Sequence, residues 1–417
     1  MGNTEIAFVL FWLTLSMYLI YKLPIACIPG LDFRQVATAF VFKAILGCAN
    51  YFVWIYIIGH GDSLRYIHDA DIVYGSLKSS PHTYLQLLTR HSLQDVPQQL
   101  IPYQHALYIE WHVPEYNMVR LFALLHVFTN GSAWADIVII ALLSTLALCA
   151  LARTLFPDGI SFYGYLLLFF LPSITFWSGG LLKEGPTIIL IAGILTLLLR
   201  SEKKPLLLLW SIPLMILLYG VRDYLLLLLV PNCILYLFAR SRPKQALWIF
   251  GGGTFLTCVV IFLADTTSAR LDLPAELTHQ QSYFLTADPD PDYAFHALEP
   301  SYRDILSHVP AAVNNVLFRP NILHSDNVFR VYQSIELLLL LALFAWLLKR
   351  TRKISCHPFG LLLLFLAVEL LLLYGLLVTD ADTLSRYRTL PVFLLLLGML
   401  FRMEKAKTPD KQGNHII

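Results

Sequence analysis

The stretch AILGCANYFVWIYIIG (residues 44–59) runs directly into HGDSLRYIHDADIVY (residues 60–74). The first part is apolar and, with a few flanking residues, long enough to cross a bilayer. The second part carries three aspartates just beyond the predicted membrane surface. Asp62 lies nearest the lipid boundary, and Gly61 before it permits a tight turn there. Aspartates of an ordinary solvated loop would give the same pattern. The choice between a functional and a merely solvated Asp62 therefore depends on the rest of the chain.

The composition is that of a polytopic membrane protein. Of 417 residues, 57% are hydrophobic and 14% are charged, and the mean hydropathy is +0.64. A soluble domain carries roughly 25% charged residues. The net charge of +2 indicates no nucleic-acid partner, because the basic residues are spread between the apolar runs. We therefore predict an all-α integral membrane fold.

The apolar runs predict about eleven transmembrane helices, since a span needs roughly 20 apolar residues and fewer when flanking groups snorkel. The predicted spans are 5–21, 40–59, 134–152, 159–177, 186–199, 205–220, 224–239, 246–264, 331–348, 359–379 and 389–401. With the N-terminus outside, most Lys and Arg residues fall in the cytoplasmic segments, as the positive-inside rule requires. The sequence thus predicts an outer N-terminus and a cytoplasmic C-terminus, in a bacterial inner membrane.

We predict a single membrane domain, 1–402, with two large outer loops at about 60–133 and 265–330, and a cytoplasmic tail, 403–417. The first loop contains the apolar stretch Met118–Phe128, which is too short to span. We expect interfacial helices in this loop, because a crossing there would invert every later loop against the charge rule.

Three outer connections pair a cation with an acid near the membrane. They are FWSGGLLKEGPT (176–187), YGVRDY (219–224) and DADTLSRYRTLP (380–391). Their cations could hold a lipid phosphate, with arginine able to do so bidentately. Taken alone, each one is better explained as a snorkelling anchor. Cations in all three outer connections favour a functional role, because the positive-inside rule disfavours them there. The cations in question are Lys183, Arg222, Arg386 and Arg388.

Together these motifs resemble the GT-C-fold glycosyltransferases that use polyprenyl-phosphate sugars, the superfamily of protein O-mannosyltransferases and lipid A aminoarabinose transferases. Gly61 to Tyr66 is similar to the family's acid-x-x-x-Tyr motif in the first outer loop. Asn117 to Leu155 looks like its juxtamembrane helix, glycine turn and following span. Leu171 to Thr187 resembles the segment that places a second acid before a proline, and Arg386 to Pro391 resembles the Arg-Tyr…Pro start of a late span.

The resemblance implies an inverting sugar transfer. Asp62 would act as general base on an acceptor hydroxyl, and Glu184 would orient the acceptor or tune Lys183. Arg386 or Arg388, helped by Lys183 or Arg222, would balance the charge of the leaving polyprenyl phosphate. Arg65 and Tyr66 of the first motif would contact substrate. Asp69 and Asp71, farther along, are expected to meet solvent only, so that their Asn variants would be mild.

The partners implied are a polyprenyl-phosphate-linked sugar donor, an acceptor glycan, lipid or protein, and membrane lipids. No cofactor is evident, and the HExxH and CxxC motifs of metal sites are missing from the sequence. The sequence does not decide whether the protein uses a divalent metal ion. Two other functions remain in competition. One is an O-antigen-type polysaccharide polymerase using arginines of the 265–330 loop, and the other is a transporter or flippase for a lipid-linked sugar, which would need polar groups near the bilayer midplane such as Glu369.

Overall fold

The computed structural model describes residues 2–92, 94–267, 272–287, 297–324, 328–351 and 357–407. Within these ranges the regular structure is helical, and no strand occurs. This confirms the all-α class. The chain divides into two compact units, Met1–Leu226 and Leu227–Ile417, which are described separately. The single membrane domain that we predicted for residues 1–402 stays a prediction.

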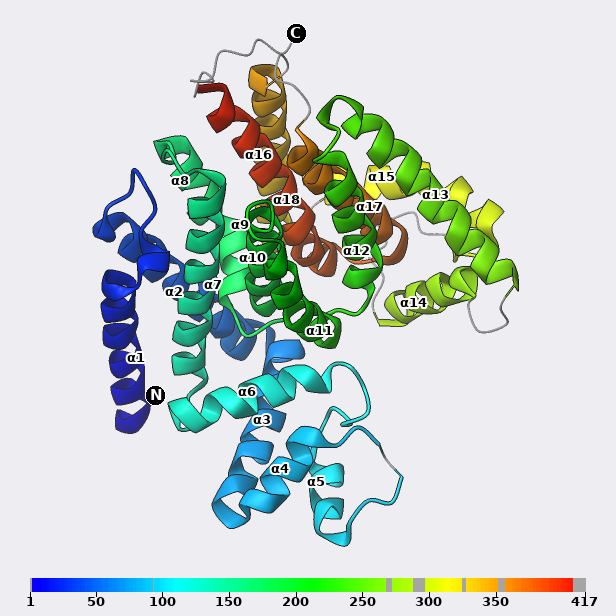
Figure 1. Cartoon of the computed structure of the whole chain (residues 1–417). Helices are drawn as coiled ribbons and strands as arrows, with labels where there is room; N and C mark the ends of the chain where they lie inside the picture. Colours follow the sequence, from blue (N-terminus) through cyan, green and yellow to red (C-terminus); the bar gives the residue numbers. More distant parts are fainter. Residues whose placement is uncertain are drawn as a thin grey trace. The chain divides into compact units, whose positions relative to one another are not determined.

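Unit 1 is built around α7 (Ala133–Leu155), which packs against the helices on either side of it in the sequence (Figure 1). These neighbours are α1 (Asn3–Lys22), α2 (Phe33–Val53), α9 (Pro172–Gly179) and α10 (Glu184–Arg200). The short α8 (Phe162–Phe169) precedes α9, and α11 (Ser211–Val221) packs on α10. Almost every side chain of the α7 apolar stretch is buried, which is why it forms the centre of the unit.

The close contact of α2 with α9 depends on two glycines. A Cβ added to Gly47 would lie 2.2 Å from the carbonyl oxygen of Gly179, so only a residue without a side chain fits. One turn earlier, the ammonium of Lys43 donates a hydrogen bond of 2.6 Å to the buried hydroxyl of Ser178. The two helices therefore meet backbone to backbone at the break that leads into α10.

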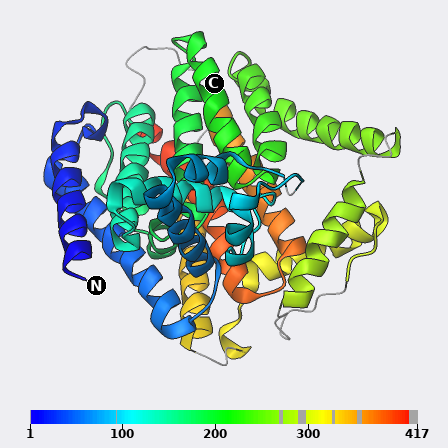
Figure 2. The ribbon, with the colours of Figure 1, turned by 90° about the horizontal axis from the view of Figure 1, so that it is seen from below.

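Four helices of the first predicted outer loop lie together at one end of unit 1, the lower end in Figure 1, and Figure 2 shows this end from below. They are α3 (Asp62–Ser79), α4 (Pro81–Thr89), α5 (Ile101–Ala106) and α6 (Tyr116–Thr129). Their buried side chains form one hydrophobic cluster that also includes Tyr51 of α2 and Ile137 of α7. The loop helices are thus packed onto the spans rather than folded as an independent domain.

The prediction that Met118–Phe128 does not span is supported by its helix. With 14 residues, α6 is about 21 Å long, shorter than the roughly 30 Å hydrocarbon core of a bilayer.

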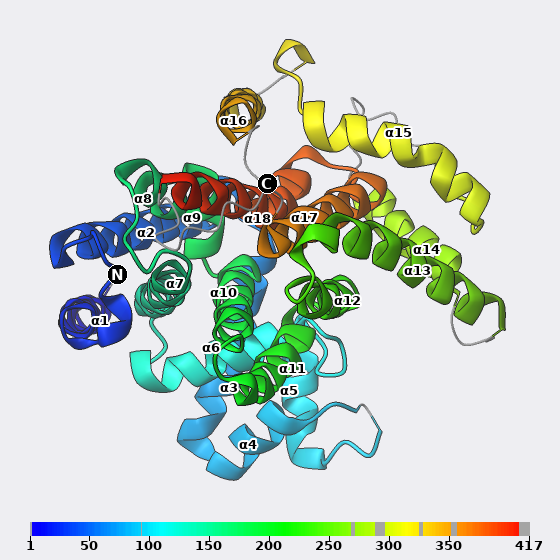
Figure 3. The same ribbon diagram turned by 45° about the horizontal axis from the view of Figure 1, so that its top comes forward.

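Unit 2 is centred on α17 (Pro358–Leu377), which packs against α18 (Ala381–Lys407) and α15 (Tyr302–Phe318). Figure 3 shows α17 and α18 side by side. The remaining helices are α12 (Tyr224–Ala239), α13 (Ala246–Thr267), α14 (Leu273–Ala287) and α16 (Val328–Thr351). The predicted outer loop 265–330 thus contains two helices, α14 and α15, that the sequence analysis did not foresee.

Seven helices in the described residues are long and apolar enough to cross a membrane, so a polytopic membrane protein is well supported but the count of eleven is not. An eighth span would come from α8 and α9, which are bent by 41° where one span, 159–177, was predicted. Pro172 begins α9, and a proline ends the preceding helix because it lacks the N–H and clashes with the turn before it. The three other predicted spans are helices too short to qualify, α10, α11 with its preceding turn, and α12.

At the C-terminal end, α18 continues to Lys407, five residues beyond the predicted end of the membrane domain at 402. Residues 408–417, the rest of the predicted tail, lie outside the described residues.

Candidate functional site

Asp62 is the first residue of α3, immediately after the turn that the sequence predicts. Gly61 adopts φ +129°, and a Cβ there would come within 2.5 Å of the Trp54 indole. This close approach and the left-handed backbone both require glycine. The α2 span continues through a π-helical turn, Trp54–Ile58, so the chain moves from apolar helix to the Asp62 carboxylate within four residues. The Asp62 side chain is half-buried.

The sequence placed Glu184 and Arg222 on one side of the membrane, and the structure joins them as a buried ion pair. Nη2 of Arg222 donates to Oε1 of Glu184, and each side chain is only 4% exposed. Glu184 begins α10, and Arg222 follows the last residue of α11. The other Arg222 amino group donates to the Tyr224 hydroxyl at 3.2 Å. Two connections 38 residues apart in the chain therefore meet at this ion pair.

The helix α6 links this ion pair to the rest of the loop. At its start, Glu115 accepts a hydrogen bond of 2.9 Å from the Lys183 ammonium. One turn on, the amide of Asn117 donates to the carbonyl of Gly220 at 2.8 Å. Along the rest of its length α6 packs on α3. The Lys183 side chain is 21% exposed.

Arg65 and Tyr66, the other predicted residues of the first motif, differ in their surroundings. Arg65 is exposed on α3. Tyr66 is 2% exposed and its ring lies 6.4 Å from that of Phe122, inside the hydrophobic cluster. A side chain in that position packs α3 against α6, and this packing role is why we leave Tyr66 out of the site proposed below.

Arg386 and Arg388, the two predicted cations of the late motif, belong to unit 2. Arg388 is buried and its Nη1 donates to the carbonyls of Val316 and Arg319 at 3.2 and 2.8 Å, which satisfies the C-terminal end of α15. These bonds give Arg388 a structural role, since unsatisfied carbonyls remain at every helix end. Arg386 is half-buried, with its guanidinium 5.4 Å from the centre of the Tyr387 ring.

The expectation that Asp69 meets only solvent is wrong. Its side chain is 0% exposed and accepts hydrogen bonds from the backbone N–H groups of Tyr108 and Ile109 at 3.0 and 2.8 Å. It also lies 2.9 Å from Nδ1 of His68. Asp69 thus anchors the segment between α5 and α6 to α3. No local sequence pattern marks this contact, because its partners are about 40 residues away along the chain.

Asp69→Asn should therefore destabilise unit 1 by about 1–3 kcal/mol, because the amide offers one acceptor oxygen to two backbone N–H groups, that of Ile109 being buried, and leaves one unsatisfied. A thermal melt of the detergent-purified protein would show a fall of roughly 2–4 °C per kcal/mol. Asp71→Asn is the control, since that side chain is 55% exposed and the amide keeps an acceptor oxygen. Equal melting temperatures for the two variants would contradict the anchoring role.

A second constellation that sequence reasoning missed joins three helices through His126. Its Nδ1 lies 3.3 Å from Oδ1 of Asp71 on α3, so the expectation that Asp71 meets only solvent is also wrong. Its Nε2 lies 2.9 Å from Oδ2 of Asp136 in the first turn of α7. The Thr129 hydroxyl donates to the other oxygen of Asp136 at 2.8 Å. His126 and Asp136 are both fully buried. Burial raises the pKa of Asp71, and the His126 imidazole opposes that rise.

The His126 contacts hold α3, and with it Asp62 at its N-terminus, on the end of the α7 span. Within the ranges that the structure describes, no three His, Cys, Asp or Glu side chains are placed to hold a metal ion. No family model, no curated protein and no solved structure matches the chain. The function is therefore argued from the geometry and from the resemblance in the motifs.

Proposed function

We propose that this protein is a membrane glycosyltransferase that moves a sugar from a polyprenyl-phosphate carrier to an acceptor hydroxyl on the outer face of the membrane, with inversion at the anomeric carbon. The observation that carries the proposal is the position of Asp62. Its half-buried carboxylate starts a helix directly beyond the candidate span Phe33–Ile58, in the same unit as the charged group Lys183, Glu184 and Arg222.

The chemistry needs a base at the lipid boundary and cations for a phosphate. The acceptor oxygen attacks the anomeric carbon while Asp62 takes its proton. The bond from the anomeric carbon to the phosphate oxygen breaks, and the phosphate leaves with the electron pair as an anion. Because a phosphate is a stable leaving group, no acid is required. Lys183 and Arg222 of unit 1 supply positive charge for the phosphate.

Glu184 has a different role in the proposal, because its carboxylate is already paired with Arg222. In that pair it fixes the position of the guanidinium at the end of α11, so that its positive charge is held in place for the leaving phosphate. Arg65, exposed on the first turns of α3, is available for the acceptor or the donor sugar.

The test is transfer by the purified protein in liposomes, with radiolabelled sugars carried on polyprenyl phosphate. We expect a labelled acceptor product and release of polyprenyl phosphate in equal amounts. A product formed only from polyprenyl-diphosphate oligosaccharides would indicate a polymerase instead. Movement of intact lipid-linked sugar across the bilayer, without cleavage at the anomeric carbon, would indicate a flippase. Comparing surface glycans with and without the gene would then identify the sugar.

The flippase is the second candidate, because buried polar groups occur inside the candidate spans of both units. In unit 1, Lys43 is 4% exposed and bonded to Ser178. In unit 2, Glu369 of α17 accepts a hydrogen bond of 2.6 Å from Asn232 of α12. Ionisable groups at such depth are costly unless paired and often mark a transport path. Both are paired here, which also suits a purely structural role.

A further inference from the structure

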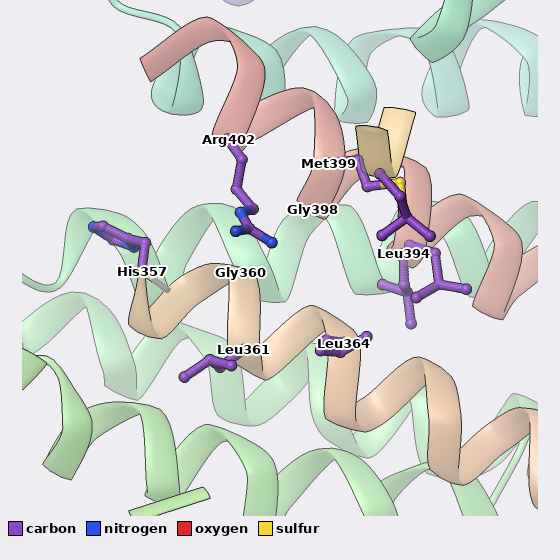
Figure 4. A pocket seen from close by; sticks show the side chains of 10 residues that line it. His357, Gly360, Leu361, Leu364, Leu394, Gly398, Met399 and Arg402 are labelled. Atoms are coloured by element: carbon purple, nitrogen blue, oxygen red, sulfur yellow. The ribbon is translucent and has the colours of Figure 1, made fainter. Parts of the chain in front are cut away.

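Unit 2 contains a cavity at the boundary of α16, α17 and α18 whose lining is apolar except at one end (Figure 4). Its volume is about 100 Å³. Cavities for compact ligands usually measure roughly 300–1,000 Å³, so this one is too small for such a ligand and has room only for a short segment of a narrow chain. The apolar lining comes from Leu348, Leu361, Leu364, Leu394, Leu395 and Met399.

The polar end carries two donors. In Figure 4, Arg402 extends from α18 toward the first turn of α17, where His357 lies. Nδ1 of His357 accepts the backbone N–H of Phe359 at 3.2 Å, which leaves the proton of the neutral ring on Nε2. A guanidinium, an imidazole N–H and the N-terminus of a 20-residue helix together favour a phosphate.

Two glycines open the space between α17 and α18. A Cβ on Gly360 would stand 4.0 Å from the Arg402 side chain, and one on Gly398 would stand 3.5 Å from Leu363. Larger side chains at these positions would occupy the cavity. Leu348, which lines the cavity, lies beside the basic residues Lys349 and Arg350 in the last turn of α16. Basic residues at helix ends attract the anionic headgroups of the adjoining lipid leaflet.

We propose that this cavity binds the headgroup-proximal segment of one chain of an anionic phospholipid, with the headgroup phosphate against Arg402 and His357. Charge selects the occupant: a zwitterionic lipid fits the apolar part equally well but gains less from the guanidinium. The apolar walls favour a lipid over a free phosphate ion, because they add to the affinity for a chain and contribute nothing to the binding of the ion. The site is independent of the proposed transferase activity, and its test requires no turnover.

The test is native mass spectrometry of the full-length protein, titrated with phosphatidylglycerol and with phosphatidylcholine. Wild type should bind phosphatidylglycerol more tightly, and Arg402→Gln should weaken that binding about tenfold, which corresponds to about 1.4 kcal/mol. Leu364→Trp should weaken both lipids, because it fills the cavity from a position that is 42% exposed and tolerates a larger side chain. Arg350→Gln is the matched control, since Arg350 lies at the same boundary outside the lining.

Three results would overturn the proposal. One is equal binding of the two lipids by wild type. The second is a loss with Arg350→Gln as large as that with Arg402→Gln, which would indicate a diffuse basic belt. The third is polyprenyl phosphate binding tenfold more tightly than phosphatidylglycerol, which would make the carrier lipid the occupant. Size-exclusion chromatography of each variant shows whether it is folded, and Gly398→Ala, which adds only an ordinary contact, serves as a folded reference.

Discussion

Asp62→Asn is expected to lower the rate of sugar transfer by about 10²–10⁴-fold, the usual contribution of a general base. Amide and carboxylate are nearly the same size, so packing at the start of α3 should survive. The amide cannot take a proton from the attacking hydroxyl. Binding of the donor should change little, because the charge that we assign to the phosphate comes from Lys183 and Arg222. The measurement is turnover in liposomes at saturating donor, with the melting temperature recorded alongside.

The matched control is Asp71→Asn on the same helix. Residues 62 and 71 are nine positions apart, which in an α-helix places them on opposite faces. Asp71 faces His126, and the amide keeps an acceptor oxygen for that contact, so its substitution should leave turnover within a few-fold of wild type. Wild-type turnover by a folded Asp62→Asn protein would rule out its role as base. A loss with Asp71→Asn alone would move the base to the Asp71–His126–Asp136 constellation.

The features that the sequence predicted well are those that depend on local pattern and chain length. Gly61 before Asp62 predicted a turn, and the turn has the positive φ that glycine allows. Met118–Phe128 is too short to span and lies in a 14-residue helix. The burial of Tyr66 could also have been foreseen, because it shares one face of a 3.6-residue repeat. The buried residues of α3 are Ser63, Tyr66, Ile67, Asp69, Ala70, Val73 and Ser76.

The sequence did not reveal contacts between residues that are far apart in the chain. It also did not reveal the lengths of helices that begin or end inside apolar runs. Asp69 looks like any loop acid until its backbone partners at Tyr108 and Ile109 are known. His126 has an unremarkable position in an apolar helix, yet two carboxylates from other helices contact it. Hydropathy also joined α8 and α9 into one span, because both are apolar and only Pro172 marks the break.

The second large effect is expected at the Glu184–Arg222 pair. Arg222→Met should destabilise unit 1 by about 3–5 kcal/mol, because it leaves the Glu184 carboxylate buried without its counter-charge. In the thermal melt this corresponds to a fall of roughly 6–20 °C. Glu184→Leu should destabilise unit 1 by a similar amount, because it leaves the Arg222 guanidinium buried without its counter-charge. Each single variant should also lose activity, but loss of folding alone would explain that.

The double variant Glu184→Leu/Arg222→Met separates the two causes. Replacing both members of a buried pair by apolar residues is often neutral or stabilising by about 1–4 kcal/mol, since no charge is left unpaired. We therefore expect the melting temperature to recover toward wild type while sugar transfer stays lost, because the site then lacks the guanidinium for the leaving phosphate. If the double variant is as unstable as either single variant, the ion pair does not stabilise the contact between the start of α10 and the end of α11. A stable double variant with wild-type turnover would remove both residues from the site and leave Lys183 as the cation of unit 1 assigned to the phosphate.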